Sequence, residues 1–152
     1  MSIAFKTVPW IEAGLGKIEI LPKVCKKLNI HRPIIISDKG LAQLGYVDNI
    51  DKILQNANLP SCIFKDVLAD PPEYNIFDAV KLFHNFDADG VIGFGGGSSM
   101  DVAKAVSYFS INEVPIENCY GLNKLISNRS PLIQIPTTAG TGSELTPIAI
   151  FT

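Results

Sequence analysis

Residues 93–107 read GFGGGSSMDVAKAVS, in which three consecutive glycines and two serines join an apolar run to a helical pattern. The apolar run predicts a short strand that is buried on both faces. The residues from Ser98 to about Phe109 predict a helix, with Ser98 as its N-cap and Asp101 in its first turn. The glycines therefore stand where a buried strand passes into a helix, and we name residues 95–99 the glycine turn.

The same alternation of strand and helix extends over most of the chain. Four short apolar runs predict strands at Pro33–Ser37, Ser61–Phe64, Val91–Phe94 and Leu132–Ile135. Helical patterns lie between them, and the first of these begins at Lys39 and is interrupted near Gly45. Strands and helices that alternate at this spacing predict an α/β fold, a parallel sheet flanked by helices.

The two ends of the chain fit this alternation less well. Ile3 to Ile11 looks extended, and Pro22 to Leu28 predicts a short helix with proline in its first turn. The last seven residues, TPIAIFT, predict a strand for which the sequence holds no partner. Because an unpaired strand leaves backbone hydrogen-bonding groups exposed, this pattern predicts a truncated chain.

Composition limits the classes of protein to consider. The chain has 152 residues, of which 47% are hydrophobic and 18% charged, so we expect one folded domain. The net charge is −2 and the sequence has no lysine or arginine run. The chain therefore lacks the basic patch that binds nucleic acid or an anionic membrane surface. No apolar stretch approaches the ~20 residues of a membrane span, and no signal peptide is visible. The cysteines are odd in number and widely spaced: Cys25, Cys62 and Cys119. This pattern predicts reduced core residues of a cytoplasmic protein.

The glycine turn has two interpretations. Its glycines can adopt positive φ and let a phosphate approach the backbone, while the amides at the start of the helix face the anion. Alternatively, they only make a tight turn and pack the helix against the sheet. Neither the GxGxxG fingerprint nor the Gly-Lys-Ser/Thr ending of a P-loop is met, so the turn indicates a dinucleotide or phosphate without saying which.

Asp38 directly follows the first predicted strand, at its carboxyl end. A carboxylate there can accept hydrogen bonds from an adenosine ribose and would repel a 2′-phosphate. In the usual dinucleotide fold this acid follows the glycine turn by about 20 residues, whereas Asp38 precedes the turn. Asp38 is therefore either a helix N-cap or a sign that the strand order differs from the usual one.

A second cluster of glycines and hydroxyls, QIPTTAGTGSELT at residues 134–146, also follows a buried strand. We name residues 137–146 the threonine loop. Its hydroxyl-bearing residues are Thr137, Thr138, Thr141, Ser143 and Thr146. Two such clusters at neighbouring strand ends can hold one extended ligand from both sides. Alternatively, the second cluster is a solvated loop, as its composition suggests.

Metal-binding and catalytic patterns are missing from the sequence. The two histidines, His31 and His84, stand alone, without a His-x-x-x-His pair or a carboxylate–histidine cluster. The sequence therefore predicts no transition-metal site in this chain. Ser98 and Ser99 lack the context of a nucleophile elbow, so no catalytic residue is predicted either.

Together, GFGGGSSMDVAKAVS and PLIQIPTTAGTGSELTPIAIFT (residues 131–152) closely resemble the N-terminal half of the iron-containing (group III) alcohol dehydrogenase family. EAGLGKIEILP and IIISDKGLAQLG, at residues 12–22 and 34–45, agree with it, so the resemblance covers nearly the whole chain. It implies that residues 1–152 are an N-terminal dinucleotide-binding domain, Rossmann-like and of the type shared with dehydroquinate synthase. The family's C-terminal helical domain, which holds Fe2+ or Zn2+, is absent from this sequence.

The resemblance also implies which residues hold the cofactor. Those matched to the pyrophosphate cradle are Gly95, Gly96, Gly97 and Ser98, with Asp101 beside them. Those matched to the path of the adenine, ribose and nicotinamide are Thr137, Thr138, Thr141 and Thr146. Asp38 matches the acid that favours NAD over NADP. Asp70 matches a residue near the adenosine, although Pro71-Pro72 departs from the commoner single proline.

The reaction implied for the parent enzyme is reversible hydride transfer between a small alcohol or aldehyde and NAD, with the metal polarising the oxygen. The chain alone is expected to bind dinucleotide weakly and to turn over nothing. A homo-oligomer is compatible with the resemblance. Two alternatives stay open: a domain of a glycerol dehydrogenase or a dehydroquinate-synthase-like enzyme, and a non-catalytic module that binds nucleotide or assembles with partners.

Overall fold

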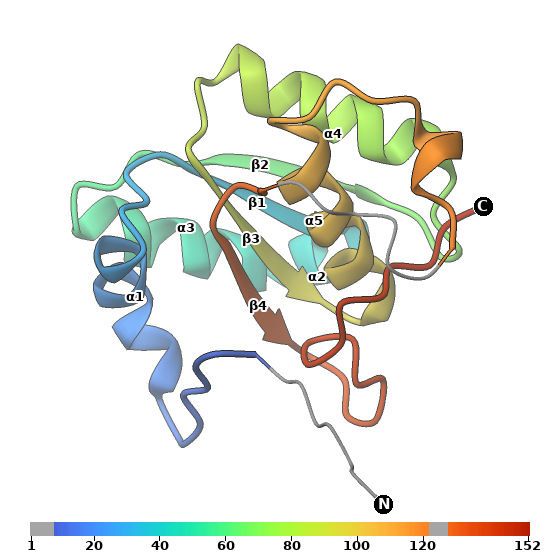
Figure 1. Ribbon diagram of the computed structural model, residues 1–152. Coiled ribbons are helices and arrows are strands. Elements are labelled where there is room, and N and C mark those ends of the chain that lie inside the picture. The colour runs from blue at the N-terminus through green and yellow to red at the C-terminus, as the bar shows by residue number, and fades with distance from the viewer. Residues whose placement is uncertain (1–7, 122–127) are drawn as a thin grey trace, which may run out of the picture.

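The computed structural model describes residues 8–121 and 128–152, and it shows a four-stranded sheet with helices on both faces (Figure 1). The strands are β1 (Pro33–Asp38), β2 (Cys62–Val67), β3 (Gly90–Gly95) and β4 (Leu132–Pro136). The α-helices are α1 (Leu21–Lys27), α2 (Lys39–Gln43), α3 (Tyr46–Asn56), α4 (Glu73–Asn85) and α5 (Gly97–Phe109). Two 3-10 helices are η1 (Lys17–Ile20) and η2 (Ile116–Cys119). All strand pairs are parallel, so the predicted α/β fold is confirmed.

The strand order is β2-β1-β3-β4. The chain passes from β1 to β2 on one side and then crosses to β3 on the other side of β1, so the direction of winding reverses between β1 and β3. Ligands of open α/β sheets bind at such a switch point, beyond the carboxyl ends of the two strands. Those ends are Asp38 and Gly95. The strand order also differs from that of the usual dinucleotide-binding fold. Such a difference was one of the two explanations for an acid, Asp38, that precedes the glycine turn.

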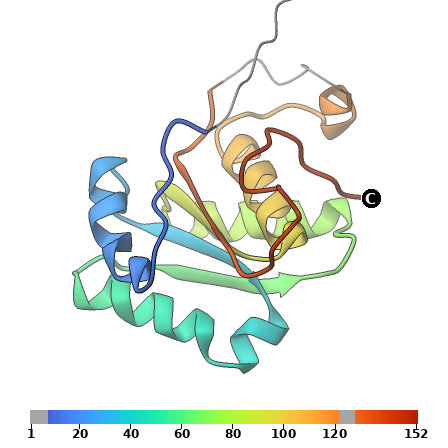
Figure 2. The same ribbon diagram turned by 90° about the horizontal axis from the view of Figure 1, so that it is seen from below.

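The sheet is buried on both faces, as its continuous apolar runs predict (Figure 2). Helices α4 and α5 cover one face, where Ile34, Ile36 and Val91 lie in the core. Helices α1 and α3 cover the other, where Ile35 and Ile92 are fully buried. This alternation follows the two-residue period of a strand. The strands that end at Asp38 and Gly95 are therefore packed on both faces.

The predicted helices are present, with one correction at the start of α5. The pattern that begins at Lys39 divides into α2 and α3 at Gly45, whose φ of 78° is left-handed. Ser98, however, is not the N-cap of α5: Gly96 takes that place, and Ser98 lies in the first helical turn. The helix starts one residue earlier because Gly97 is its first residue. The turn between β3 and α5 is therefore shorter than the sequence suggests.

The prediction of a strand at TPIAIFT is wrong. Residues 146–152 form no sheet ladder and run beside α5 to the start of α4. The Thr152 amide donates to the Pro71 carbonyl over 3.0 Å, and the Glu73 amide donates to the Thr152 carbonyl over 2.9 Å. The segment thus satisfies its polar groups at a helix terminus instead of in a sheet. Of the extended segment predicted at Ile3–Ile11, residues 3–7 lie outside the described residues, and residues 8–11 form no strand.

The three cysteines are free thiols, and Cys25 is fully buried in the core between α1 and the sheet. Burial raises the pKa of Cys25 and of Cys62 to about 11. This agrees with the prediction of reduced cysteines in apolar surroundings. Within residues 8–121 and 128–152, no helix has the length and apolar character needed to span a bilayer.

Candidate dinucleotide-binding site

The glycine turn brings the end of β3 into close contact with the first turn of α5. Gly95 has a φ of 151°, a conformation that side chains rarely allow. A Cβ atom placed at Gly95 would lie 2.6 Å from the Ser99 hydroxyl oxygen, which is shorter than any normal contact. Residue 95 must therefore be glycine, because both the backbone angle and the neighbouring atoms exclude a side chain.

The start of α5 offers amides to an anion. The Met100 amide donates to the Gly96 carbonyl over 3.1 Å and makes the first bond of the helix. The amides of Gly97, Ser98 and Ser99 precede that bond, at the positive end of the helix dipole. Amides in this position bind phosphate groups in many proteins. The glycine turn therefore has both features that a diphosphate needs: a backbone that the ligand can approach closely, and amides that make no hydrogen bond within the helix.

Asp38 fulfils both of its interpretations. One carboxylate oxygen accepts a hydrogen bond of 3.0 Å from the Leu41 amide, so Asp38 is the N-cap of α2. The other oxygen lies 3.4 Å from the position of a Cβ atom at Gly95. A group that approaches the Gly95 backbone would therefore meet the Asp38 carboxylate. The capping bond holds this carboxylate in place, and it leaves the second oxygen on the side of the glycine turn.

The threonine loop lies directly beside the glycine turn. The Thr137 amide donates to the Gly95 carbonyl over 2.9 Å. A Cβ atom at Gly96 would lie 3.5 Å from the Thr138 hydroxyl oxygen, and one at Gly97 would lie 3.7 Å from Thr141. Thr138 and Thr141 are both exposed, so a ligand can reach them. The Thr141 hydroxyl also donates to Glu144 and accepts from the Ser143 amide, each over 3.4 Å. The structure thus brings together the glycine turn, Asp38 and the first part of the threonine loop.

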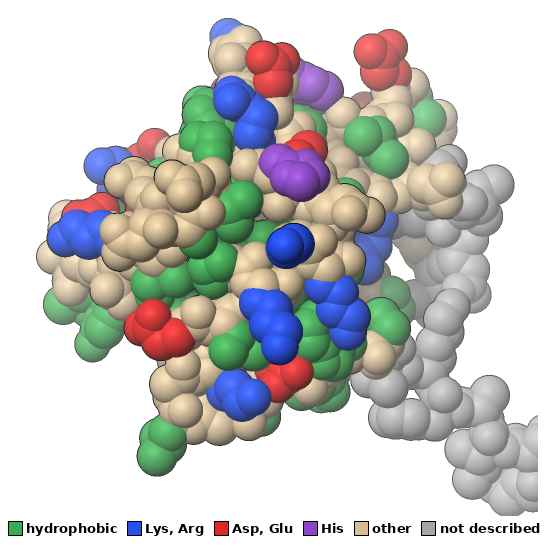
Figure 3. Space-filling model, turned by 90° about the vertical axis from the view of Figure 1, so that its left-hand side faces the viewer, with side chains coloured by type: hydrophobic (Ala, Val, Ile, Leu, Met, Phe, Trp, Pro, Cys, Tyr) green, Lys and Arg blue, Asp and Glu red, His purple; other side chains and the backbone are tan. Residues whose placement is uncertain are grey.

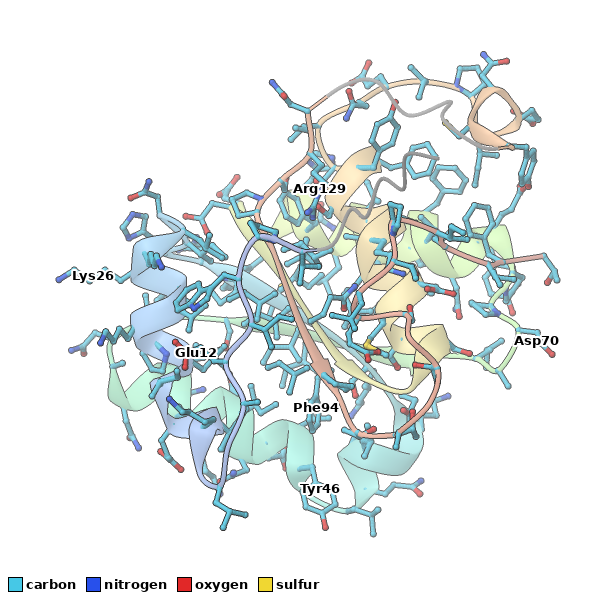
Figure 4. All side chains as sticks on the ribbon, turned by 60° about the horizontal axis from the view of Figure 1, so that its bottom comes forward. Glu12, Lys26, Tyr46, Asp70, Phe94 and Arg129 are labelled. Carbon is cyan, nitrogen blue, oxygen red and sulfur yellow. The ribbon has the colours of Figure 1, made fainter. Side chains whose placement is uncertain are left out.

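Three predicted site residues lie elsewhere. Asp101 is buried and accepts hydrogen bonds from Lys104, from Ser143 and from the Ile150 amide, so protein groups occupy its carboxylate. Thr146 is exposed at the far end of the threonine loop. Asp70 is exposed, has a left-handed φ of 48°, and lies well apart from Phe94, the residue before the glycine turn (Figure 4).

Sequence reasoning missed Lys104. Its ammonium group donates to Asp101 over 3.0 Å, to the Ser143 hydroxyl over 2.8 Å and to the Ile148 carbonyl. Burial is the main cause that holds the pKa of Lys104 below its usual value, while Asp101 acts in the opposite direction. The three-residue spacing of Asp101 and Lys104 places them on one helix face, but no sequence signal connects them to Ser143.

A hollow lies at α1, on the face of the sheet opposite to α5. It measures about 480 Å³, and lysines gather around it on the face that Figure 3 presents. Lys27 lies 3.5 Å from the centre of the Trp10 ring, and Lys17 pairs with Glu12 at 2.9 Å. These contacts join the segment before η1 to α1. None of the predicted cofactor residues lines this hollow.

No metal centre is visible in the described part of the chain. Within residues 8–121 and 128–152, His, Cys, Asp and Glu side chains nowhere gather in groups of three or more that could hold a metal ion. These residues therefore do not fit a catalytic metal, for which three protein ligands are typical.

Comparison with known proteins decides the family. Residues 9–152 match the family model described as iron-containing alcohol dehydrogenase. This chain belongs to that family. Among curated relatives, the sulfoacetaldehyde reductase of Bilophila wadsworthia is 35% identical over 151 residues, which are 99% of this chain and 39% of that protein. The chain thus spans about two fifths of the length of this relative.

Two solved structures share the fold of this chain. An alcohol dehydrogenase from Oenococcus oeni superposes with a TM-score of 0.89 at 31% identity, over 95% of this chain and 38% of its own. A sulfoacetaldehyde reductase from Bifidobacterium kashiwanohense, in complex with NAD+, superposes with a TM-score of 0.79 at 26% identity. The match covers 88% of this chain and 35% of that one. This chain and both structures therefore share one Rossmann-like fold.

Proposed function

We propose that this chain is the NAD-binding portion of a metal-dependent alcohol dehydrogenase. The observation that carries the proposal is the position of the Asp38 carboxylate, 3.4 Å from the Cβ position of Gly95, at the switch point between β1 and β3. An acidic group beside a close-approach glycine and a helix N-terminus is the arrangement that a dinucleotide needs. The related structure in complex with NAD+ supports NAD as the ligand.

Each part of the site has a role in this proposal. The diphosphate would lie against the glycine turn and receive hydrogen bonds from the first amides of α5. Asp38 would accept hydrogen bonds from the adenosine ribose and repel a 2′-phosphate, which favours NAD over NADP. Thr138 and Thr141 would contact the ligand from the side of β4. Thr137 donates its amide to Gly95 and so joins the two walls of the site. Thr146, Asp70 and Asp101 lie elsewhere, and this proposal gives them no contact with the cofactor.

For the longer protein, we infer reversible hydride transfer between an alcohol and the bound nicotinamide, with a small alcohol or aldehyde as substrate. When bound, the cofactor would supply the hydride chemistry at its nicotinamide ring. The described residues of this chain would bind and orient the cofactor, and we expect the chain alone to show no turnover. Dehydrogenase activity of the isolated chain that survives a chelator would contradict this division of roles.

Calorimetric titration of the purified chain with NAD, NADP and ADP-ribose tests the proposal. We expect NAD and ADP-ribose to bind and NADP to bind more weakly. If neither NAD nor ADP-ribose binds, the alternative of an assembly module without nucleotide is favoured, and the proposal fails.

The variant Asp38→Ser tests the role of the carboxylate. Serine keeps a side-chain cap on α2 and removes the negative charge, so stability should change little. We expect the preference for NAD over NADP to fall about tenfold, which corresponds to about 1.4 kcal/mol. Asp48→Ser is the matched control, because Asp48 is an exposed acid in the first turn of α3. An unchanged preference in Asp38→Ser would show that another group selects the cofactor.

A further inference from the structure

The threonine loop is exposed, yet one part of it is buried against α5. Thr137, Thr138 and Thr141 are exposed, whereas Ser143 is only 7% exposed. The Ser143 hydroxyl donates to Asp101 and accepts from Lys104 over 2.8 Å. Ser143 is therefore the point at which the loop is attached to the helix.

The attachment continues along the segment that follows. Lys104 donates to the Ile148 carbonyl, and the Ile150 amide donates to the second oxygen of Asp101 over 3.0 Å. Two side chains of α5 thus make hydrogen bonds to three residues of the segment 143–150. The glycine turn forms the start of the same helix. One rigid element therefore carries the phosphate-facing amides at its N-terminus and, about two turns later, holds the opposite wall of the site.

Stability alone is a poor explanation for this arrangement. The side chains of Lys104 and Asp101 are 12% and 11% exposed. Removing both charges from water carries a large desolvation penalty, and a buried ion pair often stabilises a fold no better than apolar residues would. Buried charge pairs can instead specify one arrangement among several. Here the arrangement so specified is the position of the threonine loop.

We propose that Lys104 is a positioning residue for the dinucleotide site, because its ammonium group connects Asp101 to Ser143 and Ile148 and so keeps Thr138 and Thr141 opposite the glycine turn. This inference rests on the proposed binding of NAD. Lys104 does not touch the ligand in this proposal. It acts through the loop, so its loss should weaken only those ligands that need the loop.

The test compares NAD with AMP on the full chain, by calorimetry. Both ligands can use Asp38 and the glycine turn, but NAD, with its second nucleotide, would extend farther along the threonine loop than AMP. Lys104→Met keeps the length of the side chain and removes the charge. We expect it to lower NAD affinity about tenfold and AMP affinity less than twofold. Hydrogen exchange should become faster in residues 137–150, but not in β3.

Two further variants complete the design. Lys81→Met is the matched control, because Lys81 is an exposed lysine on α4, and both affinities should be unchanged. Ser143→Ala leaves Lys104 and Asp101 paired and removes only the attachment of the loop. It should lower NAD affinity about threefold, and it keeps the inference testable if Lys104→Met does not fold.

The outcomes separate the inference from the function on which it rests. If the wild-type chain binds no NAD, both fail. If the wild type binds NAD and both variants bind it equally well, the role of Lys104 is wrong and the proposed function stands. If NAD and AMP weaken equally in both variants, Lys104 and Ser143 support the fold as a whole, and the positioning role is overturned.

Discussion

The glycine turn and the threonine loop occupy equivalent places, the carboxyl ends of the neighbouring strands β3 and β4, but they are built differently. In the turn, backbone crowding determines the shape: Gly95 is buried and Ser99 leaves no room for a side chain there. In the loop, Thr138 and Thr141 are exposed, and side-chain contacts at Ser143 hold the segment. Substitutions in the turn should therefore damage fold and binding together, whereas substitutions in the loop should damage binding with a smaller loss of stability.

The largest effect is expected for Gly95→Ala. A methyl group there would clash with Ser99 and hold the backbone in a conformation that alanine disfavours. We expect the free energy of unfolding to fall by about 3 kcal/mol, from these two costs together. Urea denaturation followed by circular dichroism measures it. A loss below about 1 kcal/mol would mean that the turn can relax, and the contrast with the loop would weaken.

Gly140→Ala is the same substitution in the threonine loop. Gly140 has a φ of 93°, but no heavy atom lies within 4 Å of the position of its Cβ. Only backbone strain remains, so the cost should be about 1 kcal/mol. The same denaturation experiment measures it. If this variant loses as much stability as Gly95→Ala, the loop is as tightly determined as the turn.

Thr138→Val removes one exposed hydroxyl and keeps the shape of the side chain. The free energy of unfolding should change by no more than about 0.5 kcal/mol, because the residue is exposed. NAD affinity should fall by about 1 kcal/mol, the net value of one hydrogen bond. Thr138→Ser keeps the hydroxyl and is the control. Equal NAD affinity of the valine variant and the wild type would remove Thr138 from the site.

The smallest effect is a change of stability with pH at Lys104. The charged groups that face it are Asp101 and Glu144. Burial holds the pKa of Lys104 in the folded chain below its ordinary value of 10.5. At a pH between the folded pKa and 10.5, the unfolded chain therefore binds more protons than the folded chain. Wild type should therefore gain stability relative to Lys104→Met as the pH rises toward 10.5 and lose this advantage as the pH falls. Urea denaturation at several pH values tests the sign, and a difference that shrinks with rising pH would contradict it.

Much of the fold was predictable because each element carries a local signal. The apolar runs at Ile34–Ile36 and Val91–Phe94 indicate strands covered on both faces, and the structure buries them fully. The prediction failed at TPIAIFT, where a strand-like pattern instead supplies hydrogen bonds to the start of α4 and to Asp101. A β-branched run indicates an extended backbone, but the partner of that backbone is a property of the tertiary structure.

The sequence by itself determined the succession of strands and helices, the two hydroxyl and glycine clusters and the family, because hydrophobic period and glycine position are local properties of the chain. Only the tertiary structure decided that β3 crosses to the other side of β1, which places Asp38 beside Gly95 although 57 residues separate them. It likewise decided that Lys104 meets Ser143, 39 residues away. Such pairs form because burial of both sheet faces selects one strand order, and no local pattern records which distant residues that order brings together.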